Sequence, residues 1–409
     1  MTETEDTGTD ESGPAAGREI VIATLMRRDS HDGVRTHITH VASMLDAGRP
    51  RSGTVVTPFS SRSLTLRPVF AVRLLVAPFS GSADVWWYRR WHAHYLTTAL
   101  RHRLRRAAPD ATVYAQCPLS ADAALRTRRV GQRVVMATHF NVSQADEWVE
   151  KGRIARDGRL YDAIRRFESE TLPRLDGIVY VSDYMRGVLE GRLPVLRAVP
   201  SVVVPNFLLP VDAPAPDASG GPGGDLITVG SLEPRKNHAY LLEVLRAASD
   251  RGYRYRLTLV GDGPLRRPLE KAARRLGLAD QVTFLGYRAN ARSLMAAHRL
   301  YCHTAVIENL PFSIVEAMSE GLPVLAAPVG GVPETLRPGV DGEFWPLDDP
   351  DGAADELIKI MEDERRRRAM GDAARQEAGR RWSVDRAGRR LLRFLVEDDR
   401  GLAAPVGDR

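Results

Sequence analysis

Short apolar runs alternate with longer amphipathic stretches along most of this chain, and this alternation restricts the folds that it can adopt. In the first half, EIVIATL precedes a helical pattern over about residues 34–47, and SGTVVTP, TVYAQC, RVVMATH, GIVYVS and SVVVPN follow. Alternating strands and helices indicate βαβ units, and strands without a polar face indicate a parallel sheet covered on both sides. We therefore predict the α/β fold class.

A second block of the same alternation begins after a segment rich in Pro and Gly. This segment, FLLPVDAPAPDASGGPGG at residues 207–224, has a composition that does not suit regular structure and is predicted to be a linker. It separates a Rossmann-like domain expected over residues 18–206 from another over residues 225–383. Ligands of doubly wound sheets bind at the carboxyl ends of the strands, so we expect the site in a cleft between the domains.

The two ends of the chain differ from these blocks. Residues 1–17 are acidic, small and almost free of apolar side chains, so they are predicted to be a disordered tail. A last helical stretch over about residues 384–398 is expected to pack back on the first domain.

Composition excludes several classes of protein. The 409 residues include only two cysteines, Cys117 and Cys302, which excludes a disulfide framework and a Cys-rich metal site. No apolar run is long enough to span a bilayer and no signal pattern begins the chain, so a cytoplasmic location is expected. The net charge is +6, but no nucleic-acid-binding motif accompanies it. An anionic ligand, an anionic membrane surface and a bias towards Arg all fit this charge.

An aromatic and basic stretch at residues 85–106, VWWYRRWHAHYLTTALRHRLRR, has two interpretations. Aromatic and Arg side chains together suit a peripheral contact with the inner face of a membrane, or a surface on which sugars stack. The alternative, which we favour, is a helix docked in the domain core with a solvated basic end.

The segment HTAVIENLPFSIVEAM carries two glutamates with seven residues between them. A helix is expected to begin close to Asn309 as its N-cap, with Pro311 in the first turn, and a helix N-terminus attracts anions. Glu308 then precedes the helix and Glu316 lies two turns into it, about 10 Å further along the axis. That separation suits the hexose and the ribose of a nucleotide-diphosphate sugar, although an isolated pair of this kind is more simply two solvated side chains.

A separate segment, VGSLEPRKN at residues 229–237, supplies basic residues where a strand is expected to end. Gly230 allows the backbone to approach a ligand, and Lys236 can neutralise a departing diphosphate without a metal. Lys236 is one of only four lysines in the chain, which favours this role over that of an ordinary surface lysine.

Together these segments resemble the large retaining glycosyltransferase family 4, whose GT-B fold consists of two Rossmann-like domains. The matching stretches are GSLEPRKN, LTLVGDGPLRRPLE, VTFLG, the segment with the two glutamates, and LPVLAAPVGGVPE, over about residues 225–345. Weaker matches are VMATH, VYVS, VVPN, the loop at Gly33 and the turn at Trp382 and Ser383.

The resemblance implies that the second domain binds the donor. Glu308 contacts hydroxyls of the donor sugar together with backbone N–H groups of the loop that follows it. These N–H groups belong to Asn309, Leu310 and Phe312, since Pro311 has none. By the same resemblance, Glu316 holds the ribose and Lys236 the diphosphate.

The resemblance also assigns residues around the donor. Tyr287 and Arg288 face the base, His139 lies near the reacting sugar, and Gly33 lets the first domain approach the phosphate or the acceptor. One residue departs from the pattern, because many relatives have Arg where this chain has Ser231. Either Arg235 supplies the missing charge or the diphosphate is held more weakly, and both interpretations remain open.

The function that follows is the retaining, metal-independent transfer of a hexose from a nucleotide-diphosphate sugar to an acceptor hydroxyl. A UDP-sugar is the favoured donor, GDP-mannose is the other, and the acceptor is a small molecule, a lipid or a saccharide. No cofactor and no metal site are expected, because the acidic pairs at residues 348–349 and 398–399 lie in polar contexts. The alternatives are a nucleotide-sugar epimerase of the same fold and a catalytically silent nucleotide-sugar-binding module.

Overall fold

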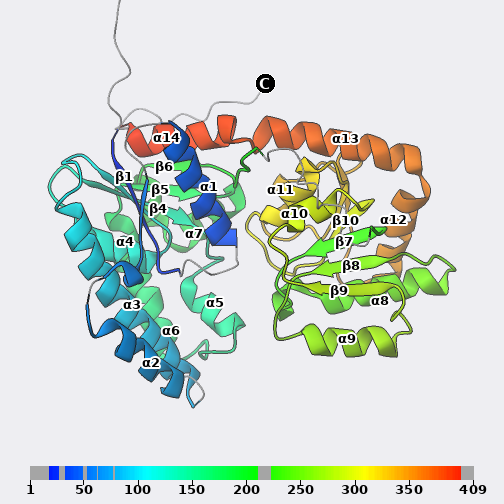
Figure 1. Cartoon of the computed structure of the whole chain (residues 1–409), viewed down its shortest axis with the longest axis horizontal. Coiled ribbons are helices and arrows are strands. Elements are labelled where there is room, and N and C mark those ends of the chain that lie inside the picture. The colour runs from blue at the N-terminus through cyan, green and yellow to red at the C-terminus, as the bar shows by residue number, and fades with distance from the viewer. Residues whose placement is uncertain are drawn as a thin grey trace, which may run out of the picture.

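The computed structural model describes residues 18–26, 33–48, 53–61, 63–76, 79–210 and 223–397, without the side chains of residues 74–76. The predicted tail at residues 1–17 and most of the predicted linker therefore lie outside the described residues. The described parts form two α/β domains (Figure 1).

The first domain contains a parallel sheet of six strands in the order β2-β1-β3-β4-β5-β6. Its strands are β1 (Ile20–Ala23), β2 (Thr54–Val56), β3 (Thr112–Ala115), β4 (Arg133–Thr138), β5 (Gly177–Tyr180) and β6 (Ser201–Val203). Its helices are α1 (Gly33–Gly48), α2 (Leu66–Val76), α3 (Gly81–Leu104), α4 (Pro118–Leu125), α5 (Gln144–Glu150), α6 (Arg159–Thr171) and α7 (Asp183–Arg192).

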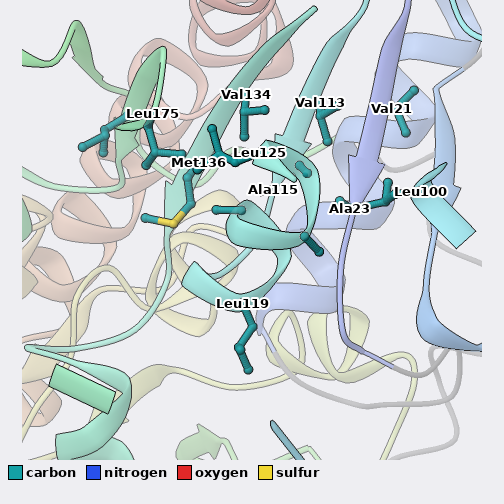
Figure 2. Close-up of a cluster of buried hydrophobic side chains, with 14 of the residues drawn as sticks. Val21, Ala23, Leu100, Val113, Ala115, Leu119, Leu125, Val134, Met136 and Leu175 are labelled. Atoms are coloured by element: carbon teal, nitrogen blue, oxygen red, sulfur yellow. The ribbon is translucent and has the colours of Figure 1, made fainter. Parts of the chain in front are cut away.

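Alternate residues of these strands enter two different cores. Val21 and Val113 pack with α3 and α4 on one face, in the cluster that Figure 2 shows. Ile22 and Tyr114 pack with α1 and α14 on the other face. Because neighbouring residues of a strand point to opposite faces, a strand that is apolar at every position is buried on both sides. This explains why these runs show no polar face.

The second domain repeats the arrangement with the strand order β12-β11-β10-β7-β8-β9, again all parallel. Its strands are β7 (Leu226–Val229), β8 (Leu257–Val260), β9 (Val282–Gly286), β10 (Leu300–His303), β11 (Val324–Ala326) and β12 (Gly342–Phe344). The helices from here to the end of the described chain are α8 (His238–Asp250), α9 (Arg266–Arg275), α10 (Ala291–Met295), α11 (Phe312–Ser319), α12 (Pro350–Glu362), α13 (Glu364–Arg381) and α14 (Arg389–Val396). The predicted fold class, two doubly wound domains of the GT-B type, is confirmed.

The chain crosses between the domains at two adjacent segments. The backbone N–H of Leu208 donates a hydrogen bond of 2.8 Å to the carbonyl of Trp382, and Leu208 also pairs with Ser383. In Figure 1, α13 and α14 run along one side of the molecule from the second domain to the first. Beyond the crossing, the Thr112 hydroxyl donates to the carbonyl of Leu395, so α14 packs on the sheet of the first domain.

The aromatic and basic stretch forms most of α3, which is anchored on one side. Tyr95 is buried, and the Trp87 indole N–H donates a hydrogen bond of 3.1 Å to the carbonyl of Val69 on α2. Trp86, by contrast, is 53% exposed. Among the described helices, none is both long and apolar enough to cross a membrane.

Truncation of Phe394 should weaken the first domain selectively. Phe394 is buried on α14, and its ring lies where a side chain at Gly177 of β5 would stand. Phe394→Ala removes a buried ring, so local stability should fall by about 3 kcal/mol or more. Amide hydrogen exchange in β3, β4 and β5 should then accelerate by roughly a hundredfold, while exchange in the second sheet stays unchanged.

The exposed Arg390 on the same helix supplies the control. Arg390→Ala should exchange like the wild-type protein. Unchanged protection of β5 in Phe394→Ala would show that α14 does not support the first sheet.

Candidate functional site

Two residues singled out from separate motifs meet where the second sheet changes direction. β7 leads to β8 on one side and β10 leads to β11 on the other, so a crevice opens at their carboxyl ends. Lys236 follows β7 and Glu308 follows β10. The Lys236 ammonium donates a hydrogen bond to Oε1 of Glu308. This ion pair marks the switch point of the sheet.

A tight turn brings Lys236 to this crevice. Gly261, which follows β8, packs against this turn with φ +144°, and a Cβ there would lie 1.9 Å from the carbonyl oxygen of Gly230, so this close contact requires a residue without a side chain. Pro234–Lys236 form a single 3-10 turn, and Asn237 follows with φ 52° and ψ 39°. Asn tolerates this left-handed conformation better than most residues do, which lets α8 start directly after the basic pair.

Glu308 is a buried carboxylate beside two cations and the ring of His303. It is 8% exposed, and its Oε1 lies 3.5 Å from Nη1 of Arg235 and 3.7 Å from Nε2 of His303. Burial by itself would raise the pKa of Glu308, but the nearby positive charges, Lys236 foremost, outweigh burial and lower that pKa. Glu308 is therefore charged at neutral pH.

Two glycines hold the backbone of Glu308 in place. A Cβ on Gly330 would lie 1.8 Å from the carbonyl oxygen of Glu308, and a Cβ on Gly331 would lie 1.7 Å from that of Asn309. The N–H of Gly331 donates a hydrogen bond of 3.0 Å to the same Glu308 carbonyl. The loop after β11 can pack this closely because neither residue has a side chain.

The predicted N-cap was wrong. α11 begins at Phe312 rather than near Asn309, and Pro311 precedes it in an extended conformation without a side-chain cap. The Asn309 amide instead donates to the carbonyls of Phe140, at 2.9 Å, and His139, at 3.4 Å, in the first domain. Buried carbonyl groups need hydrogen-bond partners, and the Asn309 side chain supplies one to these carbonyls of the first domain.

Glu316 lies within α11 and differs electrostatically from Glu308. Burial, as the largest cause, together with the neighbouring Glu320 raises the pKa of Glu316 to about 7. Arg292 lowers that pKa, but its guanidinium is also 2.6 Å from the carboxylate of Glu320. Near neutral pH, Glu308 is therefore charged, whereas Glu316 is about half protonated.

His139 and Gln116 lie on the first-domain side, after the adjacent strands β4 and β3. Nε2 of His139 is 3.1 Å from the side-chain oxygen of Gln116, while the Gln116 amide group is 3.4 Å from the carbonyl of Tyr114. An oxygen can only accept, so the proton of the neutral imidazole sits on Nε2 and leaves Nδ1 as an acceptor. Burial lowers the pKa of His139 to about 4, which keeps the ring neutral.

Gly33 and Phe312 bring the two domains into contact near this site. A Cβ on Gly33, the first residue of α1, would lie 3.4 Å from the ring of Phe312, the first residue of α11. The His40 ring on α1 is also 5.8 Å from that of Phe312. The starts of two helices from different domains therefore face each other here.

The remaining predicted residues do not join the ion-pair cluster. Tyr287 and Arg288 follow β9, which is two strands away from β7, and Tyr287 is 47% exposed. Leu310 is buried, and its carbonyl accepts a hydrogen bond of 2.8 Å from the amide of Asn206. Ser231 is partly exposed in the turn after β7.

Sequence reasoning did not assign three groups that belong to this site. His303 and His238 are buried, and His303 Nε2 and His238 Nδ1 have no hydrogen-bond partner in the structure. Burial, then Lys236, lowers the pKa of both, to about 3 and about 4. A histidine directly at the end of a predicted strand was the available signal. The second group is the glycine pair at residues 330–331, for which the sequence GGVPE was the signal. The third is Glu147: burial raises its pKa, and the nearby Lys151 and Arg235 oppose this effect.

In the described ranges, no group of three or more His, Cys, Asp or Glu side chains is arranged to hold a metal ion. The charged groups that meet at the switch point are instead one carboxylate and two cations.

Comparisons with known proteins agree with this geometry. Residues 219–377, which include both halves of the ion pair, match the family model of glycosyl transferases group 1. The N-acetyl-alpha-D-glucosaminyl L-malate synthase of Bacillus anthracis is 35% identical over 121 residues, which are 30% of this chain and 32% of that protein. The chain thus spans about a third of the length of this relative.

A longer match covers both domains. The GDP-mannose-dependent alpha-(1-6)-phosphatidylinositol monomannoside mannosyltransferase of Mycolicibacterium smegmatis is 28% identical over 307 residues, 69% of this chain and 74% of that protein. Among solved structures, Anabaena HepE in complex with UDP and glucose has a TM-score of 0.65 at 18% identity, covering 93% of this chain and 99% of that one. This likeness concerns the fold.

The two parallel sheets and the switch point have the arrangement of the GT-B fold. The match to the glycosyl transferases group 1 covers residues 219–377, which lie mainly in the second domain.

Neutralisation of Glu316 should change how stability depends on pH. A carboxyl whose pKa is raised from 4.5 to about 7 stabilises the fold below its unfolded pKa, and this contribution is lost as pH rises through 7. Relative to Glu316→Gln, the wild-type protein should therefore lose about 2 kcal/mol of stability between about pH 5 and about pH 8. Unfolding of the ligand-free protein at a series of pH values measures this.

The exposed Glu243 on α8 is the matched control. Glu243→Gln should parallel the wild-type protein at every pH. A wild-type curve that also parallels Glu316→Gln would show that Glu316 titrates in its ordinary range.

Proposed function

We propose that this chain is a retaining, metal-independent glycosyltransferase that moves a hexose from a nucleotide-diphosphate sugar to an acceptor hydroxyl. The observation that carries the proposal is the Lys236–Glu308 ion pair at the switch point of the domain that matches group 1. Both charges are largely withdrawn from water and each compensates the other. A ligand that offers a phosphate to Lys236 and hydroxyls to Glu308 can replace this pair without leaving a buried charge unpaired.

Lys236 binds the diphosphate in this proposal. Arg235 stands beside it, 3.5 Å from the same carboxylate oxygen, and this position supports Arg235 as the source of the charge that Ser231 does not provide. The N-terminus of α11 adds backbone N–H groups and the positive end of the helix dipole. Together these groups stabilise the negative charge that develops as the nucleotide diphosphate departs.

The donor lies along α11. Glu308 and the N–H groups of Asn309, Leu310 and Phe312 bind the sugar hydroxyls. Glu316 binds the ribose, because a carboxylate accepts hydrogen bonds from a diol. Tyr287 and Arg288 stack on or contact the base from the loop after β9.

Transfer needs no protein nucleophile in this scheme. The acceptor hydroxyl attacks the anomeric carbon on the face from which the diphosphate leaves, so the bond to the acceptor oxygen forms as the bond to the phosphate oxygen breaks. The leaving phosphate takes the hydroxyl proton. His139, neutral and with Nδ1 free to accept, binds a hydroxyl of the reacting sugar, while Gly33 leaves room for the acceptor side.

Two comparisons bear on the donor. The HepE structure contains UDP and glucose, which supports a UDP-sugar, whereas the name of the Mycolicibacterium smegmatis relative specifies GDP-mannose. The acceptor belongs to the broad class of small-molecule, lipid or saccharide alcohols.

Removal of either charge of the ion pair should abolish transfer. Glu308→Gln and Lys236→Ala should each lower the turnover number by at least about a hundredfold, since each group acts where charge or hydrogen bonding changes in the reaction. Nucleotide release from a panel of nucleotide sugars, with and without acceptor alcohols, measures this. Near-normal rates in both variants would refute the assignment.

Stability must be separated from chemistry in this test. Loss of one charge leaves the other buried and unpaired, which costs about 3–5 kcal/mol. Combining Lys236→Met with Glu308→Gln removes both charges and should recover much of that stability without recovering turnover. The exposed Lys271→Ala is the control and should keep full activity. Nucleotide release that ignores acceptors, or tight donor binding without turnover, would favour the epimerase or the silent binding module.

Donor identity can be measured by thermal unfolding. A ligand that binds only the folded state stabilises it by about 2.7 kcal/mol at a hundredfold excess over its Kd. UDP and UDP-sugars should raise the unfolding temperature of the wild-type protein more than GDP and GDP-mannose do. The Lys236→Met, Glu308→Gln double variant should lose this shift, and a larger shift with GDP would reverse the donor assignment.

A further inference from the structure

The positive charge of the chain is concentrated in one part of the first domain. Residues 47–109 contain eleven arginines and a single acidic residue, Asp84, so this segment carries +10. Because the whole chain carries +6, the remainder carries −4. Asp84 is buried, and the guanidinium of Arg73 lies 2.6 Å from its carboxylate. This segment of the sequence therefore carries a local excess of positive charge, which attracts anionic partners.

Large apolar side chains are exposed on the same segment. Leu64 is 96% exposed, Phe79 89%, Trp86 53% and Val72 40%. They lie on α2, on α3 and beside the start of each helix. Figure 1 shows these helices side by side at the end of the first domain that lies opposite α14. Together with two exposed arginines they form what we name the α2–α3 surface: Leu64, Arg67, Val72, Phe79, Trp86 and Arg90.

The inner side of α2 is fixed, which determines what its outer side presents. The carbonyl of Val69 accepts from the Trp87 indole, and the ring of Phe70 lies 4.6 Å from that of His92. Arg67 and Val72 are left exposed on the other side. α2 is thus held against α3 while its apolar and basic side chains face outward.

We propose that the α2–α3 surface docks on an anionic lipid bilayer. Tryptophan, phenylalanine and leucine insert into the boundary between headgroups and acyl chains, and arginines beside them bind anionic headgroups. An RNA partner would use the arginines but would leave Leu64 and Phe79 without apolar contacts. The combination of both residue types on one surface fits a membrane better.

The α2–α3 surface overlaps the stretch at residues 85–106 only at Trp86 and Arg90. Tyr95 of that stretch is buried and Trp87 is bonded to α2, so Trp86 is the aromatic ring of α3 that remains available for docking. The docking surface is centred instead on residues 64–90. It lies outside the donor site, so the proposal does not depend on the proposed function.

Flotation with lipid vesicles tests the proposal on the full chain. Vesicles of phosphatidylcholine alone are compared with vesicles that also contain phosphatidylglycerol. The wild-type protein should float with the anionic vesicles and far less with the neutral ones, and added salt should weaken this binding. Arg67→Glu combined with Arg90→Glu should lower the partition coefficient by roughly 25-fold or more. Leu64→Ser, Phe79→Ser and Trp86→Ser together should lower it at least about tenfold.

Matched controls lie elsewhere on the surface. Arg274→Glu with Arg365→Glu changes the same amount of charge at two exposed positions of the second domain. Val130→Ser and Val195→Ser remove exposed apolar side chains outside the α2–α3 surface. Both controls should float like the wild-type protein, and all variants should keep the wild-type unfolding temperature because every changed residue is exposed.

Two results would overturn the proposal. One is a wild-type protein that stays unbound with anionic vesicles. The other is an apolar triple variant that binds as tightly as the wild type, because attraction by charge alone would then indicate a soluble polyanion such as RNA, which competition with an RNA homopolymer would reveal.

Discussion

The site depends on one constraint: a carboxylate that is withdrawn from water needs a cation beside it. Glu308 meets this need through Lys236, and the two residues can meet only because β7 and β10 are neighbours whose helices leave in opposite directions. Each supporting feature serves this meeting, from the left-handed Asn237 to the glycine pair at residues 330–331. The pair also leaves neither of these two charges buried without a partner.

Most of the fold was predicted from the regular alternation of short apolar runs with amphipathic stretches. Apolar runs without a polar face predicted parallel strands buried on both sides, and the paired domains followed from their repetition. The start of α11 could not be derived in this way, because Asn309 suits an N-cap by local rules. Its amide crosses to carbonyls of the first domain, a contact made by residues far apart in the sequence. Local rules fail where a tertiary partner competes for the same side chain.

The candidate site could also be predicted only in part. Lys236 and Glu308 belong to segments with recognisable patterns, so both could be named from sequence, whereas His303 and His238 occur singly and acquire meaning only from what surrounds them. His303 Nε2 and His238 Nδ1 have no hydrogen-bond partner. Both rings stay neutral because burial, and then the nearby Lys236, oppose their protonation. Neutral rings can share the interior with Lys236 without repelling it. Because their pKa values are lowered, the two histidines add no positive charge beside Lys236 at neutral pH.

The return of α14 to the first domain has a consequence for synthesis of the protein. A ribosome releases the six strands of the first sheet long before residues 389–396, yet Leu391 and Phe394 complete one face of that sheet. Until they arrive, Ile22, Val135 and Val179 lack part of their cover, so the first domain waits in an unfinished state while the second is being made. The domain that is translated first is thus the one whose folding ends last.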